Sequence, residues 1–102
     1  MIKHIVMYKL NDPTIENKKA LQDKFLSMKG KIDVLLDIES GVDVLLSQRS
    51  YDVVLICTFN SLEDMTIYKN SEVHIPVMNY DFFRINSNTL PDIILPFAFH
   101  SL

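Results

Sequence analysis

The sequence predicts a single α+β domain in which one antiparallel sheet carries helices on one of its faces. Two observations lead to this class: short strand-like runs alternate with helix-like runs in the order strand, helix, strand, strand, helix, strand, and no internal repeat or low-complexity tract interrupts them. The chain has 102 residues, so we expect one domain over residues 1–102. A chain of this length buries roughly 65% of its unfolded surface, which is enough for a core without disulfides or metals.

The first two elements are a strand and a helix. Residues 1–10 are rich in β-branched and aromatic side chains and contain no Gly or Pro, which favours a strand with apolar groups on both faces. Helical spacing of apolar residues then runs from the candidate N-cap Thr14 to Lys29, and Lys18 is expected on the solvent side. Gly30 suits a left-handed end to this helix.

Two strands and a helix follow. Residues 34–44 read as a strand with Gly41 as a candidate bulge, and residues 51–59 read as a strand covered on both faces because they are nearly all apolar. Ser61 to Asp64 resembles a capping box, which predicts that a helix starts there.

The last third of the chain completes the sheet. A helical segment is expected over residues 72–83, beginning near Ile75 because Pro76 is tolerated only in a first turn. Residues 93–100 can supply a fourth strand, and Pro96 favours the edge of the sheet. This order is the split βαβ, or ferredoxin-like, arrangement. Its second sheet face remains apolar, so we expect a homodimer.

Charge and cysteine content exclude several classes of protein. The net charge of −3 and pI of about 5.5 provide no basic surface for nucleic acid. No run of about 20 apolar residues and no signal segment is present, so we expect a cytoplasmic protein without a membrane partner. Cys57 is the only cysteine and reads as an inert buried thiol. Asp37, Glu39 and Asp43 alternate along one strand and read as solvated edge charges.

A series of motifs adds a family resemblance. In chain order they are Ile2–Leu10, Leu26–Ile32, Ile38–Asp43 and Tyr51–Asp64, followed by Tyr68 and His74. Together they resemble the stress-responsive A/B barrel (Dabb) family over residues 1 to about 80, whereas residues 84–102 diverge from it. The resemblance implies a ferredoxin-like subunit that dimerises sheet to sheet into an α+β barrel. Each subunit would hold an apolar small molecule between sheet and helices.

The resemblance also suggests site residues. In family members that act as polyketide cyclases, a His in the first strand, a Tyr on the second helix and a His six residues later line the pocket. These positions fall on His4, Tyr68 and His74. Ser71 and Glu72 replace a His-Pro pair that the family usually carries between the last two.

These residue types suit a cofactor-free lyase or cyclase acting on a carbonyl substrate. His74 would be the general base and Tyr68 the hydrogen-bond donor that orients the enolate. The predicted pocket wall is His4, Val6 and Tyr8. Neither a metal nor a cofactor is required by this chemistry.

Other interpretations stay open at this point. Tyr68 and His74 can be ordinary core and helix-start residues of a non-catalytic, stress-associated structural dimer. A cofactor-independent monooxygenase or a haem-binding barrel is a further alternative. His4, His74 and His100 lack the spacing of a metal site.

Overall fold

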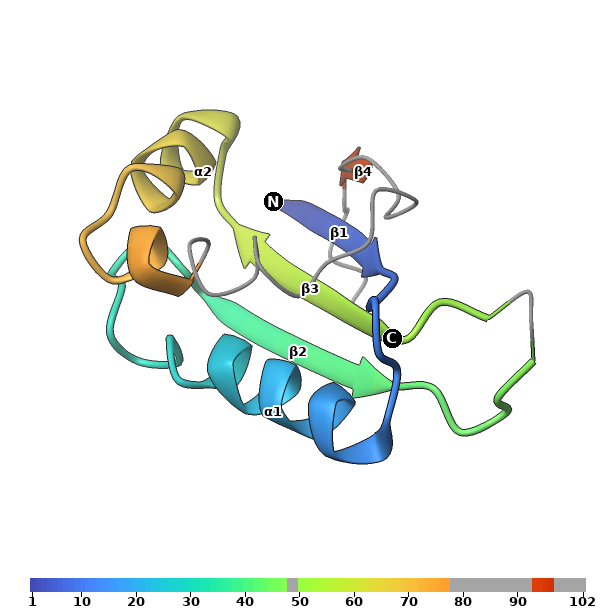
Figure 1. Ribbon diagram of the computed structural model, residues 1–102. Coiled ribbons are helices and arrows are strands. Elements are labelled where there is room, and N and C mark those ends of the chain that lie inside the picture. The colour runs from blue at the N-terminus through green and yellow to red at the C-terminus, as the bar shows by residue number, and fades with distance from the viewer. Residues whose placement is uncertain (48–49, 78–92, 97–102) are drawn as a thin grey trace.

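The protein folds into one antiparallel four-stranded sheet with helices packed on one side (Figure 1). The structure, a computed structural model, describes residues 1–47, 50–77 and 93–96. Its elements are β1 (Ile2–Tyr8), α1 (Ile15–Leu26), β2 (Asp37–Val42), β3 (Val53–Phe59), α2 (Leu62–Lys69) and β4 (Ile93–Pro96). The strand order is β2-β3-β1-β4, which confirms the ferredoxin-like α+β fold. No helix in these described ranges is long and apolar enough to cross a bilayer.

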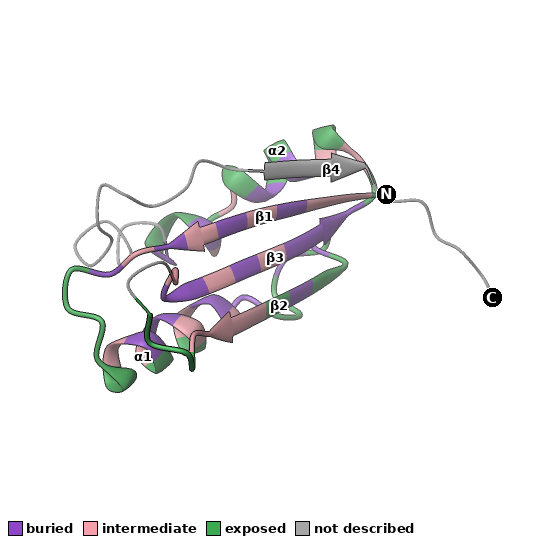
Figure 2. Ribbon diagram, turned by 90° about the vertical axis from the view of Figure 1, so that its right-hand side faces the viewer, coloured by how far each residue is buried: buried purple, intermediate pink, exposed green. Residues whose placement is uncertain are grey.

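The two central strands bury alternate residues. In β1 the buried residues are His4, Val6 and Tyr8, and the residues between them are only partly covered. Figure 2 shows the resulting purple and pink stripes on β1 and β3. Because side chains alternate across a strand, the buried set faces the helices and the partly covered set faces away from them. We call the second surface the open face.

The core lies between the sheet and the helices. Its fully buried apolar members come from α1 and the turn after it, from β3 and from α2: Leu21, Phe25, Met28, Val53, Cys57, Phe59 and Tyr68. On the open face, Ile5 pairs with Ile56 and Met7 with Val54, and all four are partly exposed. Exposing such an apolar surface to water is unfavourable in free energy, and a partner that covered it would remove this cost.

Both helix starts have the caps that the sequence predicts. Thr14 Oγ1 accepts a hydrogen bond from the Asn17 amide at 3.1 Å, and Ser61 Oγ accepts one from the Asp64 amide at 3.1 Å. The first helix ends at Leu26, three residues before the predicted end, and turns carry the chain to Gly30. Gly30 has φ of 74°, which confirms the left-handed conformation expected there.

Lys18 contradicts its predicted exposure. Its side chain is only 2% exposed, and Nζ lies 3.8 Å from Asp43 Oδ2 and 3.8 Å from Asp52 Oδ1. Asp52 Oδ2 also accepts a 2.7 Å hydrogen bond from the Leu10 amide. Asp43 is therefore not a solvated edge charge as predicted. Two carboxylates from separate segments, Asp43 and Asp52, hold the lysine head at this buried position, and their attraction outweighs its preference for water.

The second strand also differs from its prediction. It spans Asp37–Val42 rather than residues 34–44, and Gly41 pairs directly with Val54 in an uninterrupted register. The expected bulge at Gly41 is therefore wrong. Asp37 and Glu39 are exposed, as expected for edge charges.

The C-terminal expectations are met in part. The backbone of β4 pairs with β1 and forms the edge of the sheet, as Pro96 predicts. Helical conformation occurs at residues 74–77, with Pro76 in its first turn. The remainder of the predicted helix over 72–83 and of the predicted strand over 93–100 lies outside the described residues.

Candidate functional site

A cluster of buried polar and aromatic side chains connects the middle of the sheet to the end of α2. His4 on β1 is the cross-strand partner of Cys57 on β3, and both side chains face the helix layer. His4 is 6% exposed and Cys57 is fully buried. Antiparallel partners on one face have their Cβ atoms about 4.5–5.5 Å apart, so the imidazole and the thiol are neighbours.

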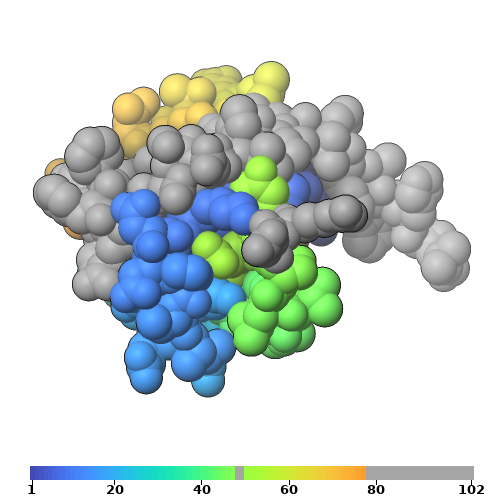
Figure 3. Space-filling model, turned by 45° about the vertical axis from the view of Figure 1, so that its right-hand side comes forward, coloured from blue at the N-terminus to red at the C-terminus, as the bar shows by residue number. Residues whose placement is uncertain are grey.

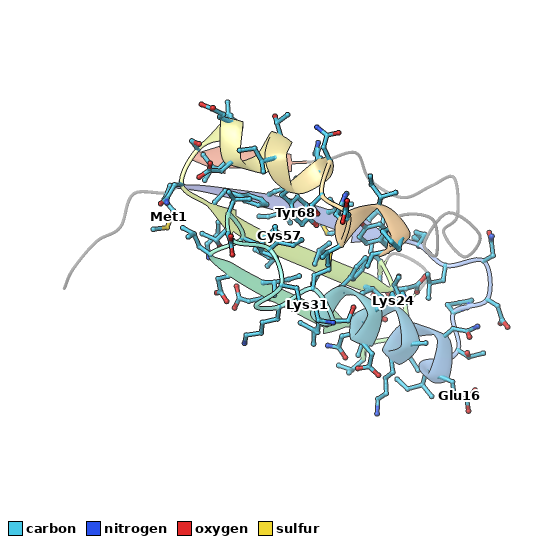
Figure 4. The ribbon with its side chains drawn as sticks, turned by 90° about the vertical axis from the view of Figure 1, so that its left-hand side faces the viewer. Met1, Glu16, Lys24, Lys31, Cys57 and Tyr68 are labelled. Carbon is cyan, nitrogen blue, oxygen red and sulfur yellow. The ribbon has the colours of Figure 1, made fainter. Side chains whose placement is uncertain are left out.

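Tyr68 on α2 contacts the Cys57 side of the His4–Cys57 pair. The helix begins at the Ser61 cap, and its two buried residues, Met65 and Tyr68, are three apart and therefore share the face toward the sheet. The Tyr68 ring lies 5.0 Å from that of Phe59, and its hydroxyl accepts a hydrogen bond from the Cys57 thiol at 3.7 Å. Figure 4 shows Tyr68 and Cys57 next to each other between α2 and the sheet.

His74 is the third member of the cluster. Its ring centroid lies 4.3 Å from that of Tyr68, and its side chain is buried. Its backbone amide donates to Ser71 Oγ at 3.0 Å, which fixes the turn after α2. The Ser71 hydroxyl therefore stabilises the local turn.

A backbone hydrogen bond selects the tautomer of His74. Its Nδ1 lies 3.0 Å from the carbonyl oxygen of Lys69. A carbonyl oxygen can only accept, so Nδ1 must carry the proton, and the neutral ring then has its basic lone pair on Nε2. This arrangement is the one that general-base histidines require, with a second hydrogen bond orienting the ring.

Burial keeps the nearby thiol protonated. Desolvation raises the pKa of Cys57 to about 12, against an opposing effect of the hydrogen bond to Tyr68 and with a smaller contribution from the charge of Asp37. The thiol is thus a weak donor that holds the Tyr68 hydroxyl, and it is not a nucleophile near neutral pH.

The structure brings together three of the five predicted site residues. His4, Tyr68 and His74 lie in one cluster, whereas Tyr8 lies four residues further along β1, or about 13 Å at the usual strand rise. There its ring packs on Phe25 of α1 with centroids 5.0 Å apart. Val6 is buried between these two ends of the strand.

Two surface hollows are lined by described residues. One, of about 320 Å³, lies where the open face meets the loop after β2, and its lining includes Met7, Gly41 and Tyr51. The other, of about 200 Å³, lies beside Gly30 and the start of β2. The side chains of the His4 cluster line neither of these two hollows.

Sequence reasoning missed two contributors to this cluster. Cys57 was expected to be buried and inert, but its contact with Tyr68 requires that it lie on the same face of the sheet as His4. The alternation of side chains along β3 could have indicated that Cys57 lies on this face. The Lys69 carbonyl left no signal in the sequence, because every residue supplies the same acceptor.

Comparison with known families identifies the family of this chain. The family model described as "Stress responsive A/B Barrel Domain" matches residues 2–87. A comparison with curated proteins finds no sequence match.

Solved structures share the architecture over nearly the whole chain. A dimeric ferredoxin-like protein from Bacteroides fragilis has 24% identity and a TM-score of 0.76, covering 94% of this chain and 95% of its own. A Dabb family protein from Mesorhizobium loti has 16% identity and a TM-score of 0.74, with 95% and 97% covered. The hydroxynitrile lyase from Passiflora edulis has 12% identity and a TM-score of 0.74, with 97% and 96% covered. At these identities the likeness establishes the fold.

Proposed function

This chain belongs to the stress-responsive A/B barrel (Dabb) domain family, and we propose that it is a cytoplasmic homodimer whose subunits each bind an apolar carbonyl compound and catalyse cofactor-free lyase or cyclase chemistry. In this proposal His74 is the general base and Tyr68 is the orienting hydrogen-bond donor. The compound would lie against the helix-facing side of β1, near His4.

The observation that carries the proposal is the hydrogen bond from His74 Nδ1 to the Lys69 carbonyl. It holds the imidazole in the tautomer whose Nε2 accepts a proton, directly beside a phenol. A buried histidine satisfies its ring N–H in any role, and the adjacent phenol of Tyr68 is what favours the catalytic one.

The chemistry follows from these two groups. Nε2 of His74 removes a proton from a carbon next to a carbonyl, and the resulting enolate oxygen receives a hydrogen bond from the Tyr68 hydroxyl. The enolate carbon attacks a second carbonyl of the same molecule, which forms a carbon–carbon bond and an alkoxide. The imidazolium returns its proton to the alkoxide, so atoms and charge balance without an added reagent.

The lyase class also agrees with the Passiflora edulis relative, which is a hydroxynitrile lyase on the same fold. Breaking a carbon–carbon bond next to an oxygen needs the same kind of group, a base that removes a proton and later returns it. One fold hosts many reactions, so the support lies in the shared demand for a positioned base.

The dimer in this proposal is supported by the apolar open face. Ile5, Met7, Val54 and Ile56 form its centre and are only partly covered within the described part of the subunit. The relative from Bacteroides fragilis with this fold is dimeric.

A second candidate is a non-catalytic structural dimer. It is favoured by the packing of Cys57, Phe59 and Tyr68, which are each no more than 1% exposed, with the first two both in contact with Tyr68. In that case these side chains would themselves fill the space that a ligand needs.

Thermal-shift measurements and turnover assays separate the two candidates. We expect a β-keto thioester to raise the melting temperature saturably, and fatty acids, phenolic acids and haem to have smaller effects. At a hundred times Kd the stabilisation is about 2.7 kcal/mol. A flat response to the whole panel would favour the structural dimer.

Variants then test the base. His74→Gln should lower kcat on the responsive thioester by about 10²–10⁴-fold while its thermal shift remains. Lys69→Ala is the matched control, because it removes an exposed side chain and retains the carbonyl that binds Nδ1. Equal turnover in His74→Gln and Lys69→Ala would refute the role of His74.

A further inference from the structure

The loop between β2 and β3 carries a run of exposed apolar side chains. Val44, Leu45 and Leu46 are 85%, 75% and 73% exposed, and we call these three residues the apolar tip. The loop extends beyond the end of the sheet in Figure 1 and forms a green projection at the surface in Figure 3. Single exposed apolar residues are common, but a contiguous run at a projection marks an interaction surface.

The apolar tip is held in one conformation. Asp43 Oδ1 accepts a hydrogen bond from the Leu45 amide at 3.1 Å, and Oδ2 accepts one from the Leu46 amide at 2.8 Å. The same carboxylate also forms an ion pair with Lys18, whose Nζ lies 3.8 Å from Asp43 Oδ2. Further along the loop, the hydroxyls of Ser47 and Ser50 are 2.8 Å apart and hydrogen-bonded.

That conformation is unfavourable at Leu46. Leu46 has φ of 60°, in the left-handed region that leucine rarely adopts. Its side chain is exposed, so side-chain packing does not offset this strain, and the hydrogen bond from its amide to Asp43 holds the conformation. Strained residues persist where the surrounding structure forces them and where function uses them. Here the forced conformation presents apolar groups outward.

The loop that carries the apolar tip adjoins the open face. The hollow of about 320 Å³ lies between the open face and the base of the loop, because its lining includes Met7 and Val54 from the open face and Asp43 and Ser50 from the loop. Gly41 contributes no side chain to it, and a Cβ there would lie 3.4 Å from Val54 Cγ1. A partner that covers the open face therefore also covers this hollow and meets the base of the loop at Asp43 and Ser50.

Charge on the open face favours a second copy of this chain as that partner. Lys3 lies on β1 beside Thr58, whose other neighbour is the exposed Asp37 on the edge strand β2. At this end of the sheet the open face is thus basic on β1 and acidic on β2, on either side of Thr58. A two-fold axis parallel to the strands would set the acidic side of each copy against the basic side of the other.

We infer that the apolar tip is a dimerisation arm, which buries Val44, Leu45 and Leu46 against the second copy and extends the open-face interface. This inference rests on the homodimer proposed above. A self-complementary interface contains every residue twice, so each substitution in the arm acts at two places.

Analytical ultracentrifugation over a concentration series tests the inference on the full chain. Leu45→Ser should raise the dimer dissociation constant about a hundredfold, from about tenfold at each of two arms, and each tenfold step corresponds to 1.4 kcal/mol. Val44→Ser combined with Leu45→Ser should raise it further. Ile67→Ser is the matched control, since Ile67 is 50% exposed on α2, away from the loop, and should change the constant less than about threefold.

The outcomes are distinguishable. Far-UV circular dichroism and heat unfolding below the dissociation constant should be the same for all variants, because the arm contributes no contact to the subunit's own core. If the native protein dimerises and Leu45→Ser dimerises as tightly as Ile67→Ser, the arm is refuted and the homodimer stands. If the native protein is monomeric at every concentration, the homodimer and the arm both fail.

Discussion

Replacing the buried Lys18 by methionine should destabilise the protein substantially. Methionine keeps the apolar stem and removes only the charged head, so packing is largely conserved. The head lies 3.8 Å from the carboxylate of Asp52, whose side chain is 11% exposed. Without the ammonium group, the Asp52 carboxylate remains largely buried, and the Leu10 amide is its remaining partner in the described contacts.

The magnitude follows from this burial. Breaking a fully buried pair by removing one partner costs about 3–5 kcal/mol, and the partial exposure of Asp52 lowers the expectation to about 2–3 kcal/mol. For a domain of this size 1 kcal/mol shifts Tm by roughly 4–8 °C, so we expect a decrease of about 10–20 °C at pH 7.

Urea unfolding and calorimetry can measure the loss of stability in Lys18→Met and compare it with that in Lys19→Met. Lys19→Met makes the same chemical change at the next residue of α1, where the side chain is exposed, and should shift stability by no more than about 0.5 kcal/mol. A double-mutant cycle with Asp52→Asn, which keeps an oxygen for the Leu10 amide, should give a coupling of at least about 1 kcal/mol. Equal stability of Lys18→Met and Lys19→Met would refute a structural role for the buried ion pair.

Two further predictions concern the thiol and the left-handed glycine. The pKa of Cys57 is raised from its ordinary value of 9.0 to about 12, so between these pH values only the unfolded chain loses the proton and stability falls as pH rises. From pH 8.5 to 10.5 the native protein should lose about 2 kcal/mol more than Cys57→Ala, which has the same lysines and tyrosines; parallel curves in urea titrations would contradict the raised pKa. Gly30→Ala should cost about 1 kcal/mol because φ there is 74°, although no atom lies within 4 Å of the new Cβ. Gly41→Ala, at a position without positive φ, should cost less in the same thermal melts, and an equal loss at both glycines would argue against backbone strain as the cause.

The elements and their order could be predicted from the sequence because they depend on local chemistry. Period-two burial in β1, the caps at Thr14 and Ser61, and the left-handed Gly30 are each encoded within a few neighbouring residues. Strand and helix ends were less accurate. The observed β2 is shorter at both ends than the strand expected over residues 34–44, because the strand ends where its pairing with β3 ends.

Part of the site was also predictable. Tyr68 and His74 are six residues apart on one connected segment, and the turn held by Ser71 brings their rings together. Their neighbour Cys57 comes from another strand, and its raised pKa arises from burial that no local pattern reports.

The contrast between Lys18 and Lys19 marks the boundary between what the sequence by itself determined and what the tertiary structure decided. Both are lysines in the same polar stretch of a helix, and the sequence determined that helix through its cap and apolar spacing. Only the packed sheet brings Asp43 and Asp52 beneath one of the two. An ion pair between residues more than 20 positions apart has no local signature, because its free energy depends on distance and burial, which exist only once the chain has folded.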